Sequence, residues 1–128
     1  MLKAGAGGYK EAVPIGFLVR VTEGIVGWVT QTGEPLMVGD VSKEPKYLFV
    51  QELADTRSEL AVPIKIGTET LGVLDIQSTE PNAFDEIDLF TAQTLGDQVA
   101  IAIENARLYQ ETREMAVLEE RNRMAREI

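Results

Sequence analysis

The sequence predicts an α+β domain that ends in a long helix, and three observations support this fold class. Two β-rich runs, residues 59–66 and 70–77, are joined by a four-residue loop that begins at Gly67, which is typical of an antiparallel hairpin. From Phe84 to the last residue the chain has no proline and only one glycine, so this stretch is expected to form one helix. Hydrophobic residues make up 45% of the 128 residues, enough for one core.

The elements before the hairpin are shorter. Apolar residues at helical spacing predict a helix at 24–29, and Gly33 stands where a glycine ends a helix. A short strand is expected at 36–38, and a second helix at 45–53, because its first residue is a proline. Within the first β-rich run, Pro63 predicts an edge position or a bulge, since proline cannot donate a ladder hydrogen bond.

The long C-terminal helix is expected to pack on the sheet with its first half. Its start is rich in acids, with Asp85, Glu86 and Asp88, which suit the positive end of a helix dipole. A kink is possible near Gly96. The stripe expected to face the sheet, bordered by Ile103, consists of Leu95, Val99, Ala102, Ala106 and Tyr109.

The second half of this helix has a different pattern, which predicts pairing with another helix. Alternating heptad positions are occupied by Leu108, Met115, Leu118, Asn122 and Ala125, with Glu111 as a mismatch. A polar Asn in such a seam favours two parallel strands in fixed register. We therefore expect a homodimer through this helix; the alternative is a single helix with frayed ends.

Composition excludes several classes of function. A net charge of −9 disfavours nucleic acids and anionic membranes as partners, because both require a basic surface. The chain contains neither Cys nor His, so metal sites that depend on thiolate or imidazole ligands are excluded. No apolar run is long enough to span a membrane, and the first residues do not form a signal peptide. A cytoplasmic location is the expectation.

A series of short motifs follows in order through the chain. They are Gly24-Ile-Val-Gly-Trp-Val29, Thr32-Gly-Glu-Pro35, Gly39-Asp-Val41, Pro45-Lys-Tyr47, Arg57-Ser-Glu-Leu-Ala-Val-Pro-Ile64, Leu71-Gly-Val-Leu-Asp75, Phe84-Asp-Glu-Ile-Asp88 and Gln98-Val-Ala-Ile-Ala-Ile-Glu-Asn-Ala-Arg-Leu-Tyr109. In this order they resemble a GAF domain. The resemblance implies a GAF-like antiparallel sheet flanked by helices, with a small-molecule pocket on one face.

The resemblance also sets the domain bounds. Residues 1–107 are expected to be a GAF domain that lacks the first helix and strand of the family, and residues 108–128 a signalling helix. A strand expected at 2–6 would lie two positions away from the strand at 70–77, with the missing strand between them. That gap would leave an uncovered strand edge, which a partner chain or a rearranged N-terminus would have to fill.

The last residues resemble a second family. The run Glu120-Arg-Asn-Arg-Met-Ala-Arg-Glu-Ile128 is similar to the start of the dimerisation helix in sensor histidine kinases of the nitrate-sensor type. In that family a phospho-accepting His follows at once, and this chain ends before it. The resemblance implies that the parent protein is an ATP-dependent histidine kinase with a response regulator as partner. This chain would be its non-enzymatic input module, since it has no His to phosphorylate.

The family pocket would lie between the sheet and the segment at 40–60. The candidate ligand-binding residues there are Tyr47, Phe49, Arg57 and Ser58. The Arg57 guanidinium could pair with an anionic ligand, or it could form a salt bridge with Asp55, Glu59 or Asp75. A ligand-free structural dimerisation module is the alternative to a sensor.

No cofactor is evident, because the cofactor chemistries known for GAF domains depend on residue types that this chain lacks. A covalent bilin, a thiolate-bound iron–sulfur cluster and a methionine sulfoxide reductase mechanism all need Cys, and His-ligated haem needs His. Cyclic nucleotide binding is a second alternative. Phe84 and Asp88 match part of the motif for that ligand, but Leu89 replaces its Glu and the expected Lys is absent.

Overall fold

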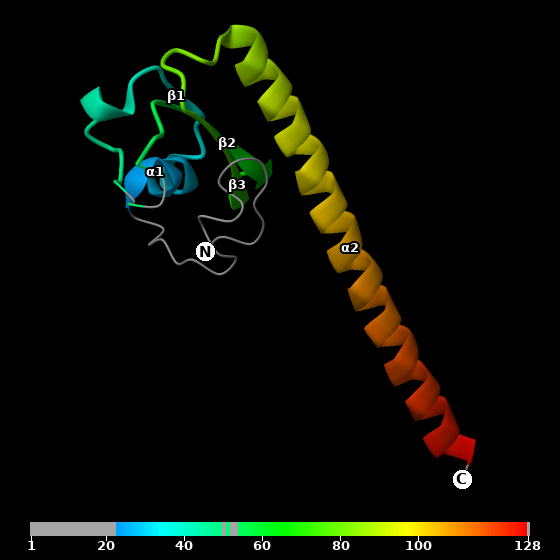
Figure 1. The fold of residues 1–128 in the computed structure, drawn as a ribbon. Coiled ribbons are helices and arrows are strands. Elements are labelled where there is room, and N and C mark those ends of the chain that lie inside the picture. Colours follow the sequence, from blue (N-terminus) through cyan, green and yellow to red (C-terminus); the bar gives the residue numbers. More distant parts are fainter. Residues whose placement is uncertain (1–22, 50, 52–53, 128) are drawn as a thin grey trace.

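The computed structural model describes residues 23–49, 51 and 54–127, with side chains as far as Arg126. The elements, in chain order, are α1 (Gly24–Thr32), β1 (Leu36–Val38), the 3-10 helix η2 (Val41–Lys43), β2 (Ser58–Ile66), β3 (Glu69–Ser78) and α2 (Glu86–Glu127). Helix α1 packs on one face of the sheet and α2 on the other (Figure 1). This arrangement confirms the α+β class with an antiparallel sheet flanked by helices.

The three strands form an antiparallel sheet in the order β1-β2-β3. Strand β2 is central: Leu60 lies opposite Met37 of β1 and opposite Ile76 of β3. The hairpin between β2 and β3 is tighter than predicted, because Ile66 already pairs with Glu69 and only two residues form the turn. Gly67, the first of them, has a φ of 59°, a left-handed conformation that a glycine adopts without strain.

Pro63 occupies a position in β2 that suits a residue without an N–H group. Strand β1 begins with Leu36, opposite Ala61, so among the described residues Pro63 has a neighbouring strand only on the β3 side. A register shift follows directly, between Ile64 and Lys65. The predicted edge position and bulge are therefore both found close to this proline.

Helix α1 forms and ends as the sequence predicts. Gly33 follows its last residue with a φ of 68°, and its N–H donates to the carbonyl oxygen of Val29. This left-handed glycine closes the helix and lets the chain turn into β1. The predicted strand at 36–38 is also confirmed.

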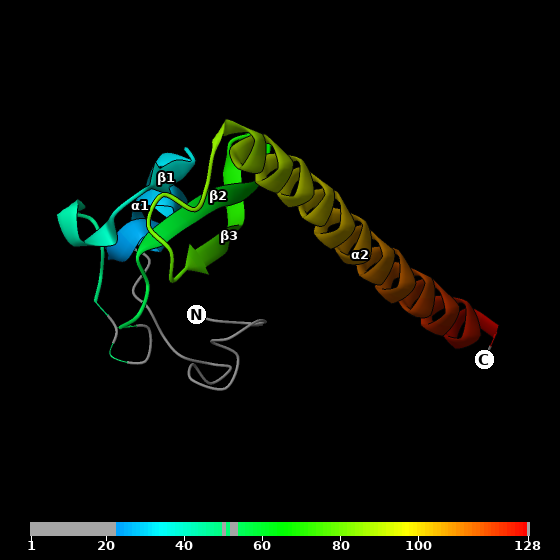
Figure 2. The same ribbon diagram turned by 45° about the horizontal axis from the view of Figure 1, so that its top comes forward.

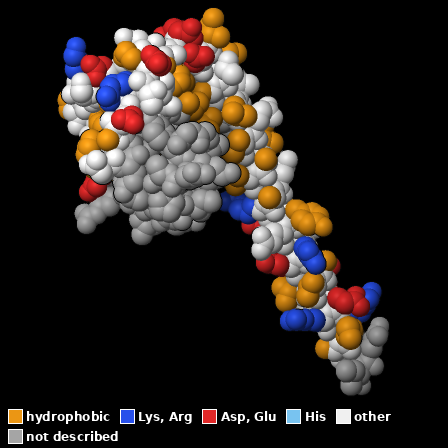
Figure 3. Space-filling view, viewed as in Figure 1, with side chains coloured by type: hydrophobic (Ala, Val, Ile, Leu, Met, Phe, Trp, Pro, Cys, Tyr) orange, Lys and Arg blue, Asp and Glu red, His pale blue; other side chains and the backbone are white. Residues whose placement is uncertain are grey.

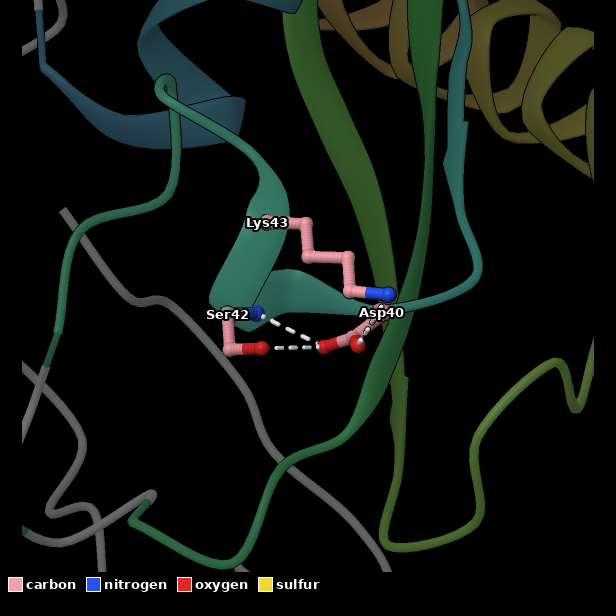
Figure 4. Close-up of polar contacts among 3 residues, drawn as sticks. All are labelled: Asp40, Ser42 and Lys43. Carbon is pink, nitrogen blue, oxygen red and sulfur yellow. Dashed lines mark hydrogen bonds and ion pairs between the residues drawn. The ribbon is translucent and has the colours of Figure 1, made fainter.

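The helix predicted at 45–53 does not form over residues 45–49: residues 45–46 form a turn, residues 47–49 have no regular structure, and the helical turn η2 lies before them. Gln51, the other described residue of the predicted range, is in a 3-10 helix. Asp40 starts η2 by accepting hydrogen bonds from the backbone N–H and hydroxyl of Ser42, at 3.0 and 2.6 Å (Figure 4). The Glu44 carboxylate then accepts from the N–H of Lys46, so side chains satisfy backbone donors that a longer helix would have used.

Two apolar clusters lie on opposite faces of the sheet. On the α1 face, the buried residues are Ile25, Val29, Val38, Val41 and Ala61. On the α2 face they are Leu60, Val62 and Ala92, with Met37, Leu74, Ile76, Phe84 and Leu89 packed around them. Successive residues of β2 point to opposite faces, which is why Leu60 and Ala61 belong to different clusters.

The face of α2 that meets the sheet differs from the prediction. Ala92, Gly96 and Ala100 are buried against it and recur every four residues, whereas Leu95, Ala102, Ala106 and Tyr109 are exposed. Val99 is half-buried. A Cβ atom on Gly96 would lie 3.3 Å from the carbonyl oxygen of Pro63, so α2 approaches β2 through its smallest residues. The predicted stripe was wrong because the side of α2 that faces the sheet is set by the close approach of Gly96 to β2, and the apolar pattern of the helix alone does not contain that contact.

The start of α2 is fixed by two reciprocal hydrogen bonds. The Asp88 N–H donates to Asp85 Oδ1 at 2.9 Å, and the Asp85 N–H donates to Asp88 Oδ2 at 3.0 Å. The acids predicted for this helix start therefore satisfy two free backbone donors. From there α2 runs unbroken through Gly96 and projects far beyond the sheet (Figure 2).

One edge of the sheet matters for the prediction of a missing strand. Within the described ranges, β3 pairs with β2 alone, so its other edge has no described neighbour. The strand predicted at 2–6 lies outside the described residues, and the arrangement beside β3 stays a prediction. No helix in the described part of the chain is both long and apolar enough to cross a membrane.

Candidate polar site on the α1 face

A chain of polar side chains crosses the α1 face of the sheet. Glu59 projects from β2 on the same face as Ala61, by the alternation of the strand. Asp75 and Gln77 project from β3 on this face, and Thr56 lies just before β2. These four residues are the polar site. They interrupt a surface that is otherwise apolar.

Glu59 is the buried acid of the polar site. It is only 3% exposed, and its side chain is hydrogen-bonded to Asp75. Burial, followed by the hydrogen bond and the negative charge of Asp75, raises the pKa of Glu59 to about 10. Glu59 therefore keeps its proton at neutral pH and donates it to the Asp75 carboxylate, which reaches solvent.

Two further hydrogen bonds orient Asp75. The amide Nε2 of Gln77 donates to Asp75 Oδ2 at 2.8 Å. The Thr56 hydroxyl, on a buried residue, donates to Gln77 Oε1 at 2.8 Å. The polar site is thus a connected series from Thr56 to Glu59, and its charge resides on Asp75. Such a site can accept hydrogen bonds from an ammonium or amide group of a small molecule.

Aromatic residues lie on the same face. Trp28 and Tyr47 are half-buried and pack against the α1-face cluster. The Lys46 ammonium lies 5.4 Å from the centroid of the Trp28 ring and 3.2 Å from a carboxylate oxygen of Glu44. The segment after η2 is therefore held onto α1 by a cation–π contact and an ion pair.

The structure brings one of the predicted ligand-binding residues to this face and places the others elsewhere. Tyr47 packs here, but Phe49 is 62% exposed. Ser58 is fully buried on the α2 face, where its hydroxyl donates to the Glu80 carbonyl oxygen at 2.6 Å. Ser58 thus secures the loop that leads into α2. Whether any of these residues binds a ligand stays a prediction.

Arg57 is exposed and turned toward the backbone. Its Nη1 donates to the carbonyl oxygens of Ala54 and Thr56, both at 3.2 Å. Within the described ranges, it forms no salt bridge with any of the three acids proposed for it. Arg57 contributes instead to lowering the pKa of Asp40, a shift caused mainly by the Ser42 hydroxyl.

Sequence reasoning missed Glu59, Asp75 and Gln77 as a group, although a signal existed. Glu59 and Asp75 each stand two positions from an apolar residue on the same face, Ala61 and Val73, and Gln77 follows two positions after Asp75. A buried carboxyl group without a cation is costly, so its presence in a core strand indicates a specific role. Across the described chain, no group of three or more acids is placed to hold a metal ion.

Comparison with known protein families identifies a matching domain. The family model for the GAF domain matches residues 3–104. Among curated proteins, the chain is 34% identical over 114 residues to a Nif-specific regulatory protein of Herbaspirillum seropedicae, covering 76% of this chain and 21% of that protein. It is 33% identical over 67 residues to the sensor histidine kinase YhcY of Bacillus subtilis, covering 52% of this chain and 18% of that protein. The chain thus spans about a fifth of either relative.

Solved structures agree on the fold. The GAF domain of a phosphoenolpyruvate-protein phosphotransferase from Coxiella burnetii superimposes with a TM-score of 0.69 at 32% identity, covering 76% of this chain and 60% of that chain. A free methionine-R-sulfoxide reductase from Neisseria meningitidis, in complex with its substrate, gives a TM-score of 0.65 at 27% identity, with 71% and 53% covered. Regulators and enzymes therefore both occur among the proteins similar to this chain.

Proposed function

The chain belongs to the GAF domain family, a family of regulatory sensor modules, and from this premise we propose that it is the sensory input module of a two-component histidine kinase. The observation that carries the proposal is the continuity of α2. One unbroken helix of 42 residues packs on the sheet at its start and ends in the run that resembles the kinase dimerisation helix. The similarity to a sensor histidine kinase supports the same reading.

The module binds a small molecule at the polar site. With Glu59 protonated, Asp75 provides a single exposed negative charge on the sheet face that also carries two half-buried aromatic residues. The ligand class that fits is a small amine or amino acid, whose ammonium group would bond to Asp75 and whose apolar part would lie near Trp28 and Tyr47. Since the chain has no Cys, it would bind such a ligand without reducing it. We infer no cofactor.

Signal transfer passes from the polar site through β2 to α2. Glu59 and Pro63 lie on the same strand, and the Pro63 carbonyl oxygen contacts α2 through Gln93 Nε2 at 3.2 Å. A ligand that shifts β2 would therefore shift the sheet-packed half of α2. Because α2 is one helix, its far end would move too, in the manner of a two-state interface. The whole protein would act in the cytoplasm on a response regulator.

Thermal denaturation tests the proposed ligand class. Free L-amino acids and L-methionine sulfoxide are the probes, and cyclic GMP is the comparison compound. An amine-bearing probe should raise Tm of the chain, and Asp75→Asn should abolish the increase. Glu69→Gln, at an exposed acid on the same strand as Asp75, is the matched control and should keep it. No increase with any amine would reject the ligand class.

The alternative of a structural dimerisation module is favoured by one observation. Leu108, Met115, Leu118 and Met124 are exposed on the projecting part of α2, which indicates a helix built for pairing. A dimer whose stability and activity respond to none of the probes would support this alternative. Cyclic nucleotide binding is less well supported, since Asp88 closes the helix start and Phe84 packs in the α2-face cluster.

A further inference from the structure

The polar site holds two carboxyl groups in direct contact. Glu59 is buried and hydrogen-bonded to Asp75, which is exposed, and within the described ranges neither forms a salt bridge with a Lys or an Arg. Two carboxyl groups can hydrogen-bond to each other only while one of them keeps its proton, because two carboxylates are both acceptors. The pair therefore carries one proton and one negative charge, and the proton lies on the buried partner, where a charge would be most costly.

The elements packed around this pair bring few other ionisable groups to it. Helix α1 and strand β1 contain none. Strand β2 itself contributes Lys65, whose ammonium donates to the carbonyl oxygen at the end of α1 at 3.3 Å. The segment after η2 contributes Tyr47 and Lys46, and the Lys46 ammonium is paired with an acid of its own segment. Among the described residues, Asp75 from β3 is the one charged group that changes the pKa of Glu59.

Cations elsewhere in the described chain are engaged by acids near them in sequence. Figure 3 shows Lys and Arg side chains over the segment around η2 and along α2, in both places close to acidic side chains. Four of these cations form ion pairs with acids no more than three residues away: Lys43, Lys46, Arg107 and Arg123. In the part of the chain that the structure describes, none is paired with Asp75. The charge of Asp75 is therefore open to a cation that a ligand supplies.

We propose that binding of an ammonium ligand at Asp75 expels the proton of Glu59, so that the polar site exchanges one proton for one organic cation. The proposal deepens the proposed function: it rests on the amine ligand class and states how pH regulates binding of that class. In the exchange the O–H bond of Glu59 breaks, the oxygen keeps the electron pair, and the proton passes to the buffer. The occupied site then holds two carboxylates and one ammonium, so its net charge is the same as before.

An ammonium group offsets the causes that keep Glu59 protonated. Burial, followed by the hydrogen bond and the charge of Asp75, raises the pKa of Glu59 to about 10. A cation in hydrogen-bond contact lowers the pKa of a carboxyl group by roughly 1–3, because it stabilises the ionised form. An ammonium has three N–H donors, enough to bond to both carboxylates. The ionisation of Glu59 is thereby brought toward neutral pH, but only while the ligand is bound.

Asp75 provides the route by which the proton leaves. It is exposed and hydrogen-bonded to buried Glu59, and the amide of Gln77 holds its Oδ2 at 2.8 Å, so it keeps its orientation during the exchange. Because the occupied site binds fewer protons than the empty site, affinity for the amine must rise with pH. Protons and ligand thus compete for the polar site, and the module responds to an amine most strongly in alkaline conditions.

Calorimetric titration with n-butylammonium chloride tests the exchange, because this probe, like a lysine side chain, remains a cation up to pH 9. At pH 9 the heat of binding should differ between buffers of different ionisation enthalpy, which gives the number of protons released. Kd should be at least about fivefold lower at pH 9 than at pH 7. Glu59→Gln should bind with the same Kd at both pH values and release no proton. Glu69→Gln, at an exposed acid on β3, is the matched control and should behave like the natural protein.

Infrared difference spectroscopy of the natural protein gives a second readout that needs no variant. Adding the probe at pH 9 should remove the C=O stretching band of a protonated carboxylic acid. Binding with equal Kd at both pH values, no released proton and an unchanged band would overturn this inference alone and leave the amine ligand class standing. A folded Glu59→Gln variant that keeps the pH dependence would assign the proton to another group and overturn the inference as well. No binding of n-butylammonium at either pH would reject the amine ligand class and this inference together.

Discussion

The two faces of the sheet are made from alternate residues of the same strands, yet they are closed in different ways. On the α2 face, Leu60 and Val62 are fully buried against a helix that approaches through Ala92 and Gly96. On the α1 face, the neighbouring residue Glu59 is equally buried but polar, and it depends on Asp75 for its hydrogen bond.

The difference shows how the domain separates stability from chemistry. Tight apolar packing joins β2 to α2, which makes the α2 face suitable for passing on a displacement. A buried carboxyl group reduces stability, and a fold retains such a group where a function needs it. Substitutions on the α2 face should therefore reduce folding stability, whereas substitutions at the polar site should change its pH dependence and ligand response.

The largest expected effect is on the α2 face. Leu60→Ala should destabilise the domain by about 2–5 kcal/mol, because it leaves a cavity among fully buried side chains. Urea denaturation followed by circular dichroism measures the loss. Phe49→Ala is the control on an exposed side chain and should change the free energy of unfolding by no more than about 0.5 kcal/mol. A similar loss for the two variants would contradict the assigned core.

A smaller but clear loss is expected where α2 approaches β2. Gly96→Val adds a branched side chain 3.3 Å from the Pro63 carbonyl oxygen, which must push the helix away from the strand. Overpacking of this kind costs roughly 1–3 kcal/mol. Ala106→Val, at an exposed position of the same helix, is the control and should be almost neutral. Urea denaturation measures the free energy of unfolding of both variants. Equal values for the two would show that α2 does not need this close contact.

The polar site should make stability fall as pH rises. The folded-state pKa of Glu59, about 10, is above its unfolded value near 4.5, so the unfolded chain loses this proton first. The contribution of protonated Glu59 to the free energy of unfolding is fully present below the unfolded-state pKa and is lost as pH rises toward the folded-state pKa. The slope is at most about 1.4 kcal/mol per pH unit for one group. Glu59→Gln should remove that slope and be more stable than the natural protein at pH 8.

Denaturation curves at pH 5, 6.5 and 8 measure this effect. Glu69→Gln, at an exposed acid in the turn region of the same hairpin, is the matched control and should keep the slope of the natural protein. A variant at Glu59 that is equally less stable at every pH would mean that Glu59 is ionised in the folded state.

The sequence predicted the elements of this fold better than it predicted their contacts. Local sequence signals, such as Gly33 after an apolar run at helical spacing, predicted helix α1, the point where it ends and the two long strands. Local signals could not predict which side of α2 faces the sheet, because that depends on how closely Gly96 approaches a carbonyl group 33 residues earlier in the chain. Likewise, Glu59 and Asp75 form a pair only through the register of β2 and β3, which no single segment encodes.

The smallest effect is expected at the edge of the α1 face. Lys46→Met removes the ammonium over the Trp28 ring and the ion pair with Glu44, but it keeps a long apolar side chain against the ring. Contacts of this kind contribute about 0.5–1 kcal/mol each at partly exposed positions, and salt screens the ion pair. We expect a loss below about 1 kcal/mol, smaller in 1 M NaCl than in low salt. Lys43→Met is the control, since its ammonium is 3.9 Å from Asp40 and far more exposed, and it should be nearly neutral. A loss at Lys46 as large as that of Leu60→Ala would mean that the α1 face depends on this contact for stability, and the separation of the two faces would fail.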